Sequence, residues 1–388
     1  MKKIVSLLFI LLFASYVLQA KETPVDPSTF VEAYNAAEDG DVLLLADGEY
    51  TFSKLKFPAG AIVTLKAAEG ANPVLKSTEI GSESADGGGL IFDGIDIDRG
   101  ADQFIYAAAG VTLKNVRIIA FRNLTIKNVG RCIFRSNDDV ATPEYTIAKI
   151  EFTNCIITNC GTNGWGLLFP RHEVKEVSVT NSTLYNYVGG ENFFRANNGV
   201  ALPNNEFKFT FENNTVYKWA NGSNRALCNT ADKYGENSTY IFRNNIITVP
   251  GVAGMEPMIV NTASGTVIGE NNLIVDYGSY VGGNQTISDL TLAGLGLTSI
   301  EFANPESGDF TLPTTSPLAT AGKDGKCVGD PRWFGILQSI TTPTNEKNIV
   351  SVKYFDILGR QISEDVKGIV IVRKTYEDGS IAAEKQLK

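Results

Sequence analysis

The sequence predicts an all-β protein whose main body is a parallel β-helix. A short pattern recurs through the middle of the chain, in which an apolar residue, a variable residue and asparagine stand among alternating apolar and polar positions. From Gly94 to Asn271 the intervals between copies are 29, 31, 27, 32, 31 and 27 residues. A second register follows with the same period, and no helical periodicity surrounds the copies. Such a repeat is typical of a solenoid whose coils stack in register.

Five asparagines occupy equivalent positions in the first register, so they fall on successive coils. Neighbouring strands lie about 4.8 Å apart, and amide side chains that are stacked in this way can hydrogen-bond one another. We therefore expect a ladder inside the solenoid with a structural role. Its members are Asn123, Asn154, Asn181, Asn213 and Asn244.

The second register places arginines at or next to equivalent positions on three coils: Arg135, Arg171 and Arg195. Stacking would bring them into a row with neighbours about 5 Å apart. Like charges in a row repel one another, whereas fork-shaped donors suit the carboxylates or sulfates of an anionic chain. The alternative is that each arginine pairs with a nearby acid, for which the candidates are Asp138, Glu173 and Glu191.

Two further residues near this row are candidates for contact with a sugar chain. Asn197 follows Arg195 at the outer end of its expected strand. Trp165 could serve as a stacking platform, as could Trp219, although packing at a coil corner explains either tryptophan equally well. We therefore expect Arg135, Arg195, Asn197 and Trp165 to bind substrate.

The ends of the chain indicate how the body is flanked. Residues 1–20 carry two lysines, a short apolar run and a terminal alanine, which is typical of a signal peptide. Residues 26–38 fit a capping helix with aspartate before its first turn and proline inside it. We place the β-helix at 22–338, a Thr- and Pro-containing linker at 339–348 and a small strand-rich module at 349–388.

Composition limits the partners. The net charge of −9, with no block of lysine or arginine, argues against nucleic acid and anionic membrane surfaces. The apolar run near the N-terminus is shorter than the roughly 20 residues that a spanning helix needs. The five cysteines show no metal-site spacing, and most fall in apolar strands, where buried thiols are the simpler explanation.

Two segments resemble a known superfamily. Residues 37–50, with the sequence AEDGDVLLLADGEY, resemble the opening of pectate-lyase-like right-handed β-helices, especially the chondroitinase B and alginate lyase family. Residues 308–322 resemble the closing segment of secreted Bacteroidetes β-helix domains, many of unknown function. In the tail, 354–360 and 367–372 resemble the C-terminal sorting domain of type IX secretion cargo. The resemblance implies a right-handed β-helix that is exported and handed to that secretion machinery.

The lyase resemblance also implies a catalytic set: a lysine base, an arginine acid and a calcium ion held by asparagine and glutamate. Arg171 and His172 resemble the family's Arg-His pair, but Arg135 stands where the lysine is expected. Guanidinium stays protonated in proteins, so Arg135 cannot act as a general base. His172 and Lys149 remain as possible substitutes. The acids that would hold calcium are not found in the stretch 128–133, so no metal or other cofactor is predicted.

The sequence thus predicts a secreted or cell-surface β-helix that binds an acidic polysaccharide and resembles polysaccharide lyases, with catalysis in doubt. Any catalytic site would comprise Arg171, His172 and Lys149. One alternative is an active polysaccharide lyase, acting by β-elimination on a uronate-containing glycan, or a hydrolase with a non-standard site. Another is a structural surface or adhesion protein with no affinity for glycans.

Overall fold

The computed structural model describes residues 21–334, except 53, 77, 101, 138–143, 163–165, 188, 190 and 197–205, and four later segments, 349–355, 361–363, 369–376 and 381–387. The chain divides into two compact units, residues 1–336 and 337–388. The predicted signal peptide and linker lie outside the described residues. No helix in the described ranges is long and apolar enough to cross a membrane.

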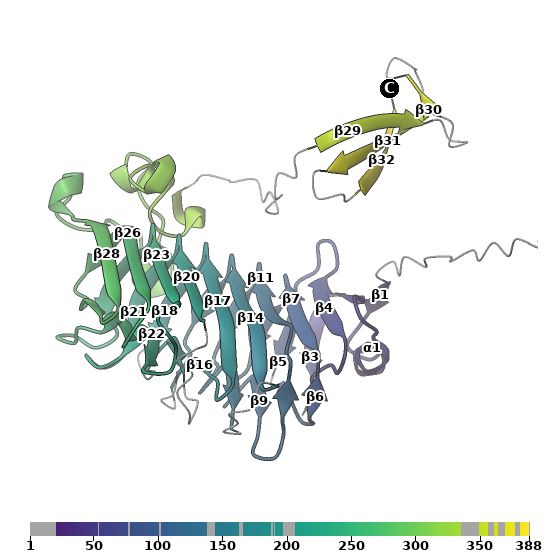
Figure 1. Cartoon of the computed structure of the whole chain (residues 1–388), viewed down its shortest axis with the longest axis horizontal. Helices are drawn as coiled ribbons and strands as arrows, with labels where there is room; N and C mark the ends of the chain where they lie inside the picture. Colours follow the sequence, from purple (N-terminus) through teal and green to yellow (C-terminus); the bar gives the residue numbers. More distant parts are fainter. Residues whose placement is uncertain are drawn as a thin grey trace, which may run out of the picture. The chain divides into compact units, whose positions relative to one another are not determined.

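The first unit is a parallel β-helix, as predicted, with three strands in a typical coil (Figure 1). Sheet 1 contains β1 (Glu22–Val25), β2 (Val42–Leu45), β4 (Ile62–Ala67), β7 (Gly89–Asp93), β11 (Ile118–Arg122), β14 (Thr146–Thr153), β17 (Glu173–Thr180), β20 (Lys208–Glu212), β23 (Thr239–Arg243), β26 (Thr266–Val275) and β28 (Asn284–Leu290). Sheet 2 contains β3 (Gly48–Thr51), β5 (Pro73–Lys76), β8 (Asp96–Asp98), β12 (Thr125–Lys127), β15 (Ile156–Thr158), β18 (Thr183–Tyr187), β21 (Thr215–Trp219) and β24 (Ile246–Pro250), and it joins sheet 1 through the long strand β26.

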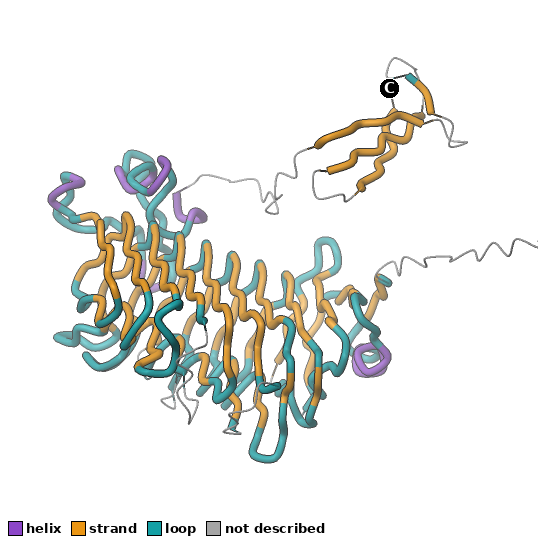
Figure 2. Tube along the Cα trace, viewed as in Figure 1, coloured by secondary structure: helices purple, strands orange, loops and turns teal. Residues whose placement is uncertain are grey.

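Sheet 3 contains β9 (Ile105–Ala107), β13 (Phe134–Ser136), β16 (Leu168–Phe169), β19 (Phe194–Arg195), β22 (Ala226–Ala231), β25 (Met258–Thr262) and β27 (Tyr280–Val281). A separate two-stranded pair is formed by β6 (Ala85–Asp86) and β10 (Leu113–Lys114). Loops connect the strands of each coil and vary in length (Figure 2). The coils therefore stack in register while their loops differ.

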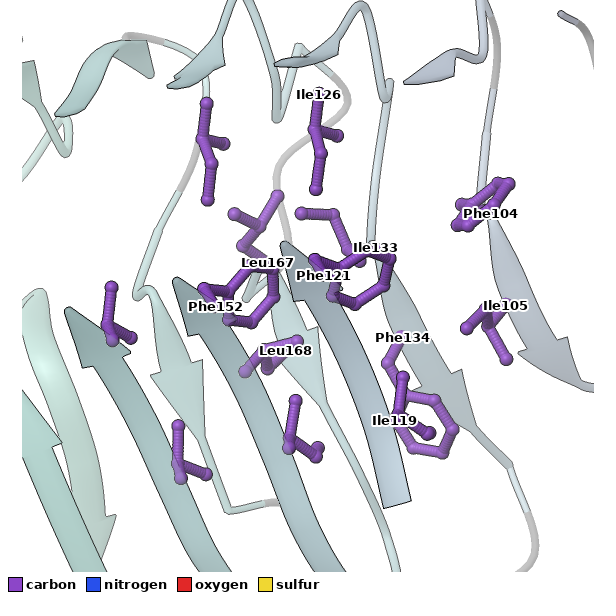
Figure 3. Close-up of a cluster of buried hydrophobic side chains, with 14 of the residues drawn as sticks. Phe104, Ile105, Ile119, Phe121, Ile126, Ile133, Phe134, Phe152, Leu167 and Leu168 are labelled. Carbon is purple, nitrogen blue, oxygen red and sulfur yellow. The ribbon is translucent and has the colours of Figure 1, made fainter. Parts of the chain in front are cut away.

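The core runs along the inside of the solenoid and is built from alternate residues of the strands. Phe92, Phe121 and Phe152 occupy the same inward position on successive coils of sheet 1, and their rings stack with centroids 5.2 and 4.8 Å apart. Leu168 of sheet 3 belongs to the same buried cluster as Phe121 and Phe152 (Figure 3). A single coil cannot bury its apolar side chains, but stacked coils bury them against one another in a continuous core.

The repeated asparagines mark the turn between sheet 1 and sheet 2. Asn123, Asn154, Asn181, Asn213 and Asn244 all have φ between 51° and 58°. Asparagine adopts this left-handed conformation more readily than most residues, and glycine does so freely, which explains Gly94 in the same position of an earlier coil. The period in the sequence is therefore the period of a turn.

The side chains of these turn asparagines do not form one interior ladder. Asn154 Nδ2 donates to Asn123 Oδ1 at 2.8 Å, and Asn123 is exposed. Asn213 Nδ2 instead donates to the carbonyl oxygen of Cys327, while Asn244 Oδ1 accepts from the backbone N–H of Lys323. The expectation of an interior ladder through all five positions is corrected, because a residue in a left-handed turn directs its side chain away from the strand face that lines the core.

An interior ladder exists one residue later. Asn214, Asn245 and Asn272 are fully buried, and each Nδ2 donates to the Oδ1 of the next coil's residue: 3.1 Å to Asn245, 2.7 Å to Asn272 and 2.7 Å to Asp289. Each Oδ1 also accepts a backbone N–H from the preceding coil, beginning with that of Ser182. The ladder satisfies polar groups that would otherwise be stranded in the core.

The N-terminal end is covered by the short helix α1 (Phe30–Ala36), which lies inside the expected 26–38 segment. Asp26 accepts hydrogen bonds from Ser28 and Thr29 and so closes a turn before the helix rather than capping its first residue. Phe30 is fully buried and packs against the rings of Tyr50 and Phe52. The helix thus shields the first coil, which also includes the additional strand β1.

After β28 the chain folds back over sheet 2 in an irregular segment, residues 291–334. It contains the 3-10 helices η1 (Ala293–Leu295), η2 (Pro305–Ser307), η3 (Pro317–Ala319), η4 (Lys323–Gly325) and η5 (Pro331–Phe334). Leu318, Val328 and Phe334 form a second apolar cluster with Ile246 and Leu273 of the solenoid. This segment explains why Asn213 and Asn244 bond to backbone groups outside the coils.

The second unit contains four antiparallel strands in the order β30–β29–β31–β32. They are β29 (Ile349–Phe355), β30 (Gln361–Ile362), β31 (Ile369–Tyr376) and β32 (Ile381–Leu387). A small C-terminal β module is thus present, as predicted.

Candidate functional site

The outer face of sheet 3 carries a column of aromatic, arginine and asparagine side chains. Arg135 pairs in register with Tyr106 on one side and Phe169 on the other. The pairing of Leu168 with Phe194 places Arg195 on the coil beside Phe169, and Arg195 is followed by Asn229 and Asn261. We call Tyr106, Arg135, Phe169, Arg195, Asn229 and Asn261 the sheet 3 column.

The strands direct these side chains outward because their neighbours enter the core. Ile105, Phe134, Leu168 and Phe194 are all fully buried, and adjacent residues of a strand point to opposite faces. The apolar core therefore fixes which residues of each strand point inward, and the residues of the sheet 3 column point outward as a result.

Each of the two arginines in the column lies over an aromatic ring. The guanidinium carbon of Arg135 is 5.5 Å from the centre of the Tyr106 ring, and that of Arg195 is 5.3 Å from the centre of the Phe169 ring. Tyr106 is itself held by a 2.7 Å hydrogen bond that its hydroxyl oxygen accepts from Asn137 Nδ2. Such cation–π contacts are worth about 0.5–1 kcal/mol at exposed sites, and they restrict the guanidinium planes.

The three arginines do not form one row. Phe169 takes the position between Arg135 and Arg195, and Arg171 lies beyond the end of β16. The backbone N–H of Arg171 donates to Ser136 Oγ and its Nη1 donates to the carbonyl oxygen of Asn137, both at 2.8 Å. Arg171 therefore ties the loop after β16 to the preceding coil. The expected row is corrected to two arginines separated by an aromatic residue.

Pairing with an acid, the alternative considered for the arginines, holds for Arg195. Arg195 Nη1 lies 3.0 Å from Glu191 Oε2, and Arg225 Nη2 lies 3.1 Å from Glu191 Oε1. Glu173 opens β17, and burial raises the pKa of its carboxyl, with Lys175 opposing the shift. Glu191 thus joins the column to Arg225, which precedes β22.

His172 lies inside the protein. It is 1 % exposed, its Nδ1 is 2.6 Å from Ser136 Oγ, and its ring packs near that of Tyr145. Arg171 and His172 therefore both contact Ser136, but the imidazole is shielded from a ligand on the outer face.

Lys149 belongs to a different sheet. It lies on β14 of sheet 1, with Nζ 3.0 Å from Glu151 Oε2 and 3.4 Å from Glu176 Oε1. Partial burial lowers the pKa of Lys149, but the two carboxylates outweigh it, so the pKa lies above its usual value. The described contacts do not bring Lys149 together with Arg171 or His172, and a protonated amine is a poor general base.

Trp165 and Asn197 lie outside the described residues, as does Asp138. Trp219 is 1 % exposed and stacks on Tyr187 with ring centroids 4.2 Å apart, so it is a core residue. Within the described ranges, no three His, Cys, Asp or Glu side chains converge in a way that could hold a metal ion.

Sequence reasoning missed several members of this site. Asn229 and Asn261 were visible in the second register, one residue after the same apolar pairs that precede the arginines. Ile105-Tyr106 repeats the pattern one coil earlier. The contact between Glu191 and Arg225 joins loop residues of two coils, and such residues do not recur with the period of the sequence repeat.

The chain was compared with family models, curated proteins and solved structures. No family model and no curated protein matches the sequence. Similar solved structures include two of the PL6 family alginate lyase AlyGC, with 18 % identity and a TM-score of 0.41 for one, and 17 % and 0.35 for a point mutant. Each match covers 70 % of this chain and 39 % of the lyase chain, so this chain spans about two fifths of the lyase's length.

Proposed function

We propose that this protein binds an acidic polysaccharide along the sheet 3 column and does so without cleaving it. The observation that carries the proposal is the pair of arginines, Arg135 and Arg195, each held over an aromatic ring on the same outer face. Guanidinium groups fixed in this way present several donors in a plane, which suits carboxylate and sulfate groups.

The geometry of the column favours an extended ligand over a compact one. Its six residues follow one another along the solenoid at the spacing of adjacent strands, about 4.8 Å per coil. Tyr106 supplies an aromatic surface at one end, and the amides of Asn229 and Asn261 supply donors and acceptors at the other. A linear chain of sugars could contact the five partly exposed members of the column, all but the buried Phe169, whereas a small molecule could contact only two or three.

Binding without catalysis is supported by the placement of the candidate bases. Abstraction of a proton next to a uronate carboxyl needs an uncharged base that reaches the ligand. His172 is buried, and Lys149 lies on sheet 1 between two carboxylates. Neither His172 nor Lys149 can therefore act as a base on the outer face of sheet 3.

The proposal includes the cellular setting that the sequence predicts. Residues 1–20 would direct export, and the module at 349–388 would be read by the secretion machinery, leaving the protein secreted or at the cell surface. An acidic glycan is an extracellular ligand, so the proposed location and the proposed ligand agree.

The experiment is a glycan-binding measurement with an activity assay on the same samples. Wild-type protein should bind uronate-containing or sulfated glycans more tightly than neutral ones, and added salt should weaken the binding. Tyr106→Ala and Arg135→Ala should reduce the affinity, whereas Arg243→Ala should not, because Arg243 lies on sheet 1 and pairs with Glu270.

Formation of unsaturated uronate ends by the wild-type protein would show an active lyase instead. Affinity for no glycan at all would favour a purely structural surface role.

A further inference from the structure

Two arginines at the C-terminal side of the column share one carboxylate. Glu191 Oε2 accepts a hydrogen bond from Arg195 Nη1 at 3.0 Å, and Glu191 Oε1 lies 3.1 Å from Arg225 Nη2. Arg195 belongs to β19, and Arg225 immediately precedes β22 on the next coil. With one negative charge between two positive charges, the cluster keeps a net charge of +1.

The cluster is partly exposed to solvent, and the contacts among the described residues use only some of its donors. The side chains of Arg195 and Arg225 are 39 % and 27 % exposed, and that of Glu191 is 21 % exposed. Arg225 Nε is buried and has no hydrogen-bond partner within the described part of the chain. A guanidinium offers five N–H donors, and a single carboxylate oxygen satisfies few of them.

The backbone around Glu191 is held in place by its neighbour. Asn192 Oδ1 accepts the backbone N–H of Ala226 at 2.8 Å and lies 3.4 Å from Asn229 Nδ2. Asn229 Oδ1 in turn accepts from Asn261 Nδ2 at 3.3 Å. The residue after Glu191 and the residue after Arg225 are therefore tied to each other across the two coils, so the backbone positions of Glu191 and Arg225 are held by the strands of sheet 3.

We infer that Arg195 and Arg225 form a subsite for one oxyanion of the ligand, a carboxylate or a sulfate ester, and that Glu191 occupies this subsite when no ligand is bound. The inference rests on the proposed function and adds to it Arg225, which lies outside the column, and Glu191 as an internal competitor. An incoming oxyanion takes over the guanidinium donors, and the Glu191 side chain moves toward solvent. Glu191 therefore lowers the affinity for every ligand and favours those that engage both arginines.

The decisive variant is Glu191→Gln, which keeps the size of the side chain and removes its charge. It should tighten binding of an anionic glycan by roughly two- to fivefold, the range that an exposed ion pair contributes, and should steepen the salt dependence. The matched control is Glu49→Gln, since Glu49 forms a single exposed pair with Lys76 on sheet 2. The control should leave the affinity unchanged.

Two probes identify the oxyanion. A polyuronate without sulfate and a sulfated glycan without uronate are each titrated against wild type and Glu191→Gln, and the larger gain marks the group that the subsite accepts. Arg225→Ala should weaken binding of that probe several-fold, although Arg225 lies outside the column. If Glu191→Gln does not fold, as judged by thermal unfolding, the loss caused by Arg225→Ala decides the question.

The outcomes separate this inference from the proposed function. If wild type binds neither probe, both are overturned. If wild type binds and Tyr106→Ala weakens binding, but Glu191→Gln binds no more tightly and Arg225→Ala has no effect, the proposed function stands and the internal competitor is wrong.

Discussion

Arg195 lies over the ring of Phe169, the residue beside it on the preceding coil, with its guanidinium carbon 5.3 Å from the ring centre. Phe169 is 3 % exposed, so its ring serves the arginine rather than a ligand. The aromatic residue that interrupts the expected row of charges therefore separates two guanidinium groups and orients one of them.

Replacing this ring should loosen the arginine without unfolding the protein. Phe169→Leu should reduce the affinity for an anionic glycan by a few-fold, because a cation–π contact is worth about 0.5–1 kcal/mol. Titration calorimetry checks the affinity. Phe302→Leu is the control, since Phe302 packs against Phe310 in the segment after the solenoid, and equal losses in both variants would contradict the orienting role.

Arg171 and Arg135 should differ in their importance for binding. Arg171 donates hydrogen bonds from its backbone N–H and its Nη1 to the preceding coil, whereas Arg135 lies in the sheet 3 column. Arg135→Ala should therefore weaken glycan binding more than Arg171→Ala, while Arg171→Ala should lower the melting temperature more. A larger binding defect in Arg171→Ala would place the ligand over the loop after β16.

The interior ladder should matter more for stability than any exposed asparagine. Asn245→Ala removes the acceptor of Asn214 and the donor to Asn272, and each buried group left unsatisfied costs about 1–3 kcal/mol. Urea unfolding should show this loss, while Asn284→Ala on the exposed strand β28 should change stability little. Equal stabilities of the two variants would mean that the ladder is replaced by water.

The turn asparagines should respond to backbone conformation rather than to loss of the amide. Asn159, in the turn that follows β15, is exposed and has φ of 52°, the same left-handed conformation as the asparagines between sheet 1 and sheet 2. Asn159→Gly should therefore be close to neutral, whereas Asn159→Val should destabilise by about 1–2 kcal/mol because a β-branched residue resists the left-handed region. Thermal unfolding of both variants tests this, and a neutral valine would show that the turn can change its conformation.

Asp330 should make stability depend on pH. Burial raises its pKa to about 6, although Arg332 and the hydroxyl of Thr183 oppose the shift. Between the unfolded value near 3.8 and about 6 the folded state binds the extra proton, so this contribution to stability is present at low pH and is lost as the pH rises through the window. The unfolding free energy of wild type minus that of Asp330→Asn should fall across this range. A constant difference would contradict the raised pKa.

The sequence period was sufficient to predict the β-helix because stacking converts a repeat along the chain into neighbours in space. The period could not show which asparagines lie in the turn and which lie in the core, since a turn asparagine and a ladder asparagine are adjacent in the sequence. The pairs are Asn213-Asn214, Asn244-Asn245 and Asn271-Asn272. The doubled asparagine was the available signal, with its first residue in the turn and its second in the ladder.

The candidate site was harder to predict than the fold. Arg135 and Arg195 were found because they follow buried apolar pairs, and a strand fixes the direction of such residues. Arg171 was misplaced by two positions because β16 ends at Phe169. The bridge from Glu191 to Arg225 depends on loop conformation, which varies from coil to coil and has no period.

The asparagine ladder has a direction, because every amide in it donates to the following coil. Each asparagine amide accepts a hydrogen bond at its oxygen and donates one from its nitrogen. A further coil with asparagine at this position could therefore be inserted between Asn214 and Asn272, and the series of hydrogen bonds would continue. Asp289 accepts hydrogen bonds from Asn272 and from the hydroxyl of Tyr280. An ionised carboxylate has no N–H or O–H group, so it cannot donate a hydrogen bond to a further coil. The ladder of side-chain hydrogen bonds therefore ends at Asp289, in the last coil that it joins.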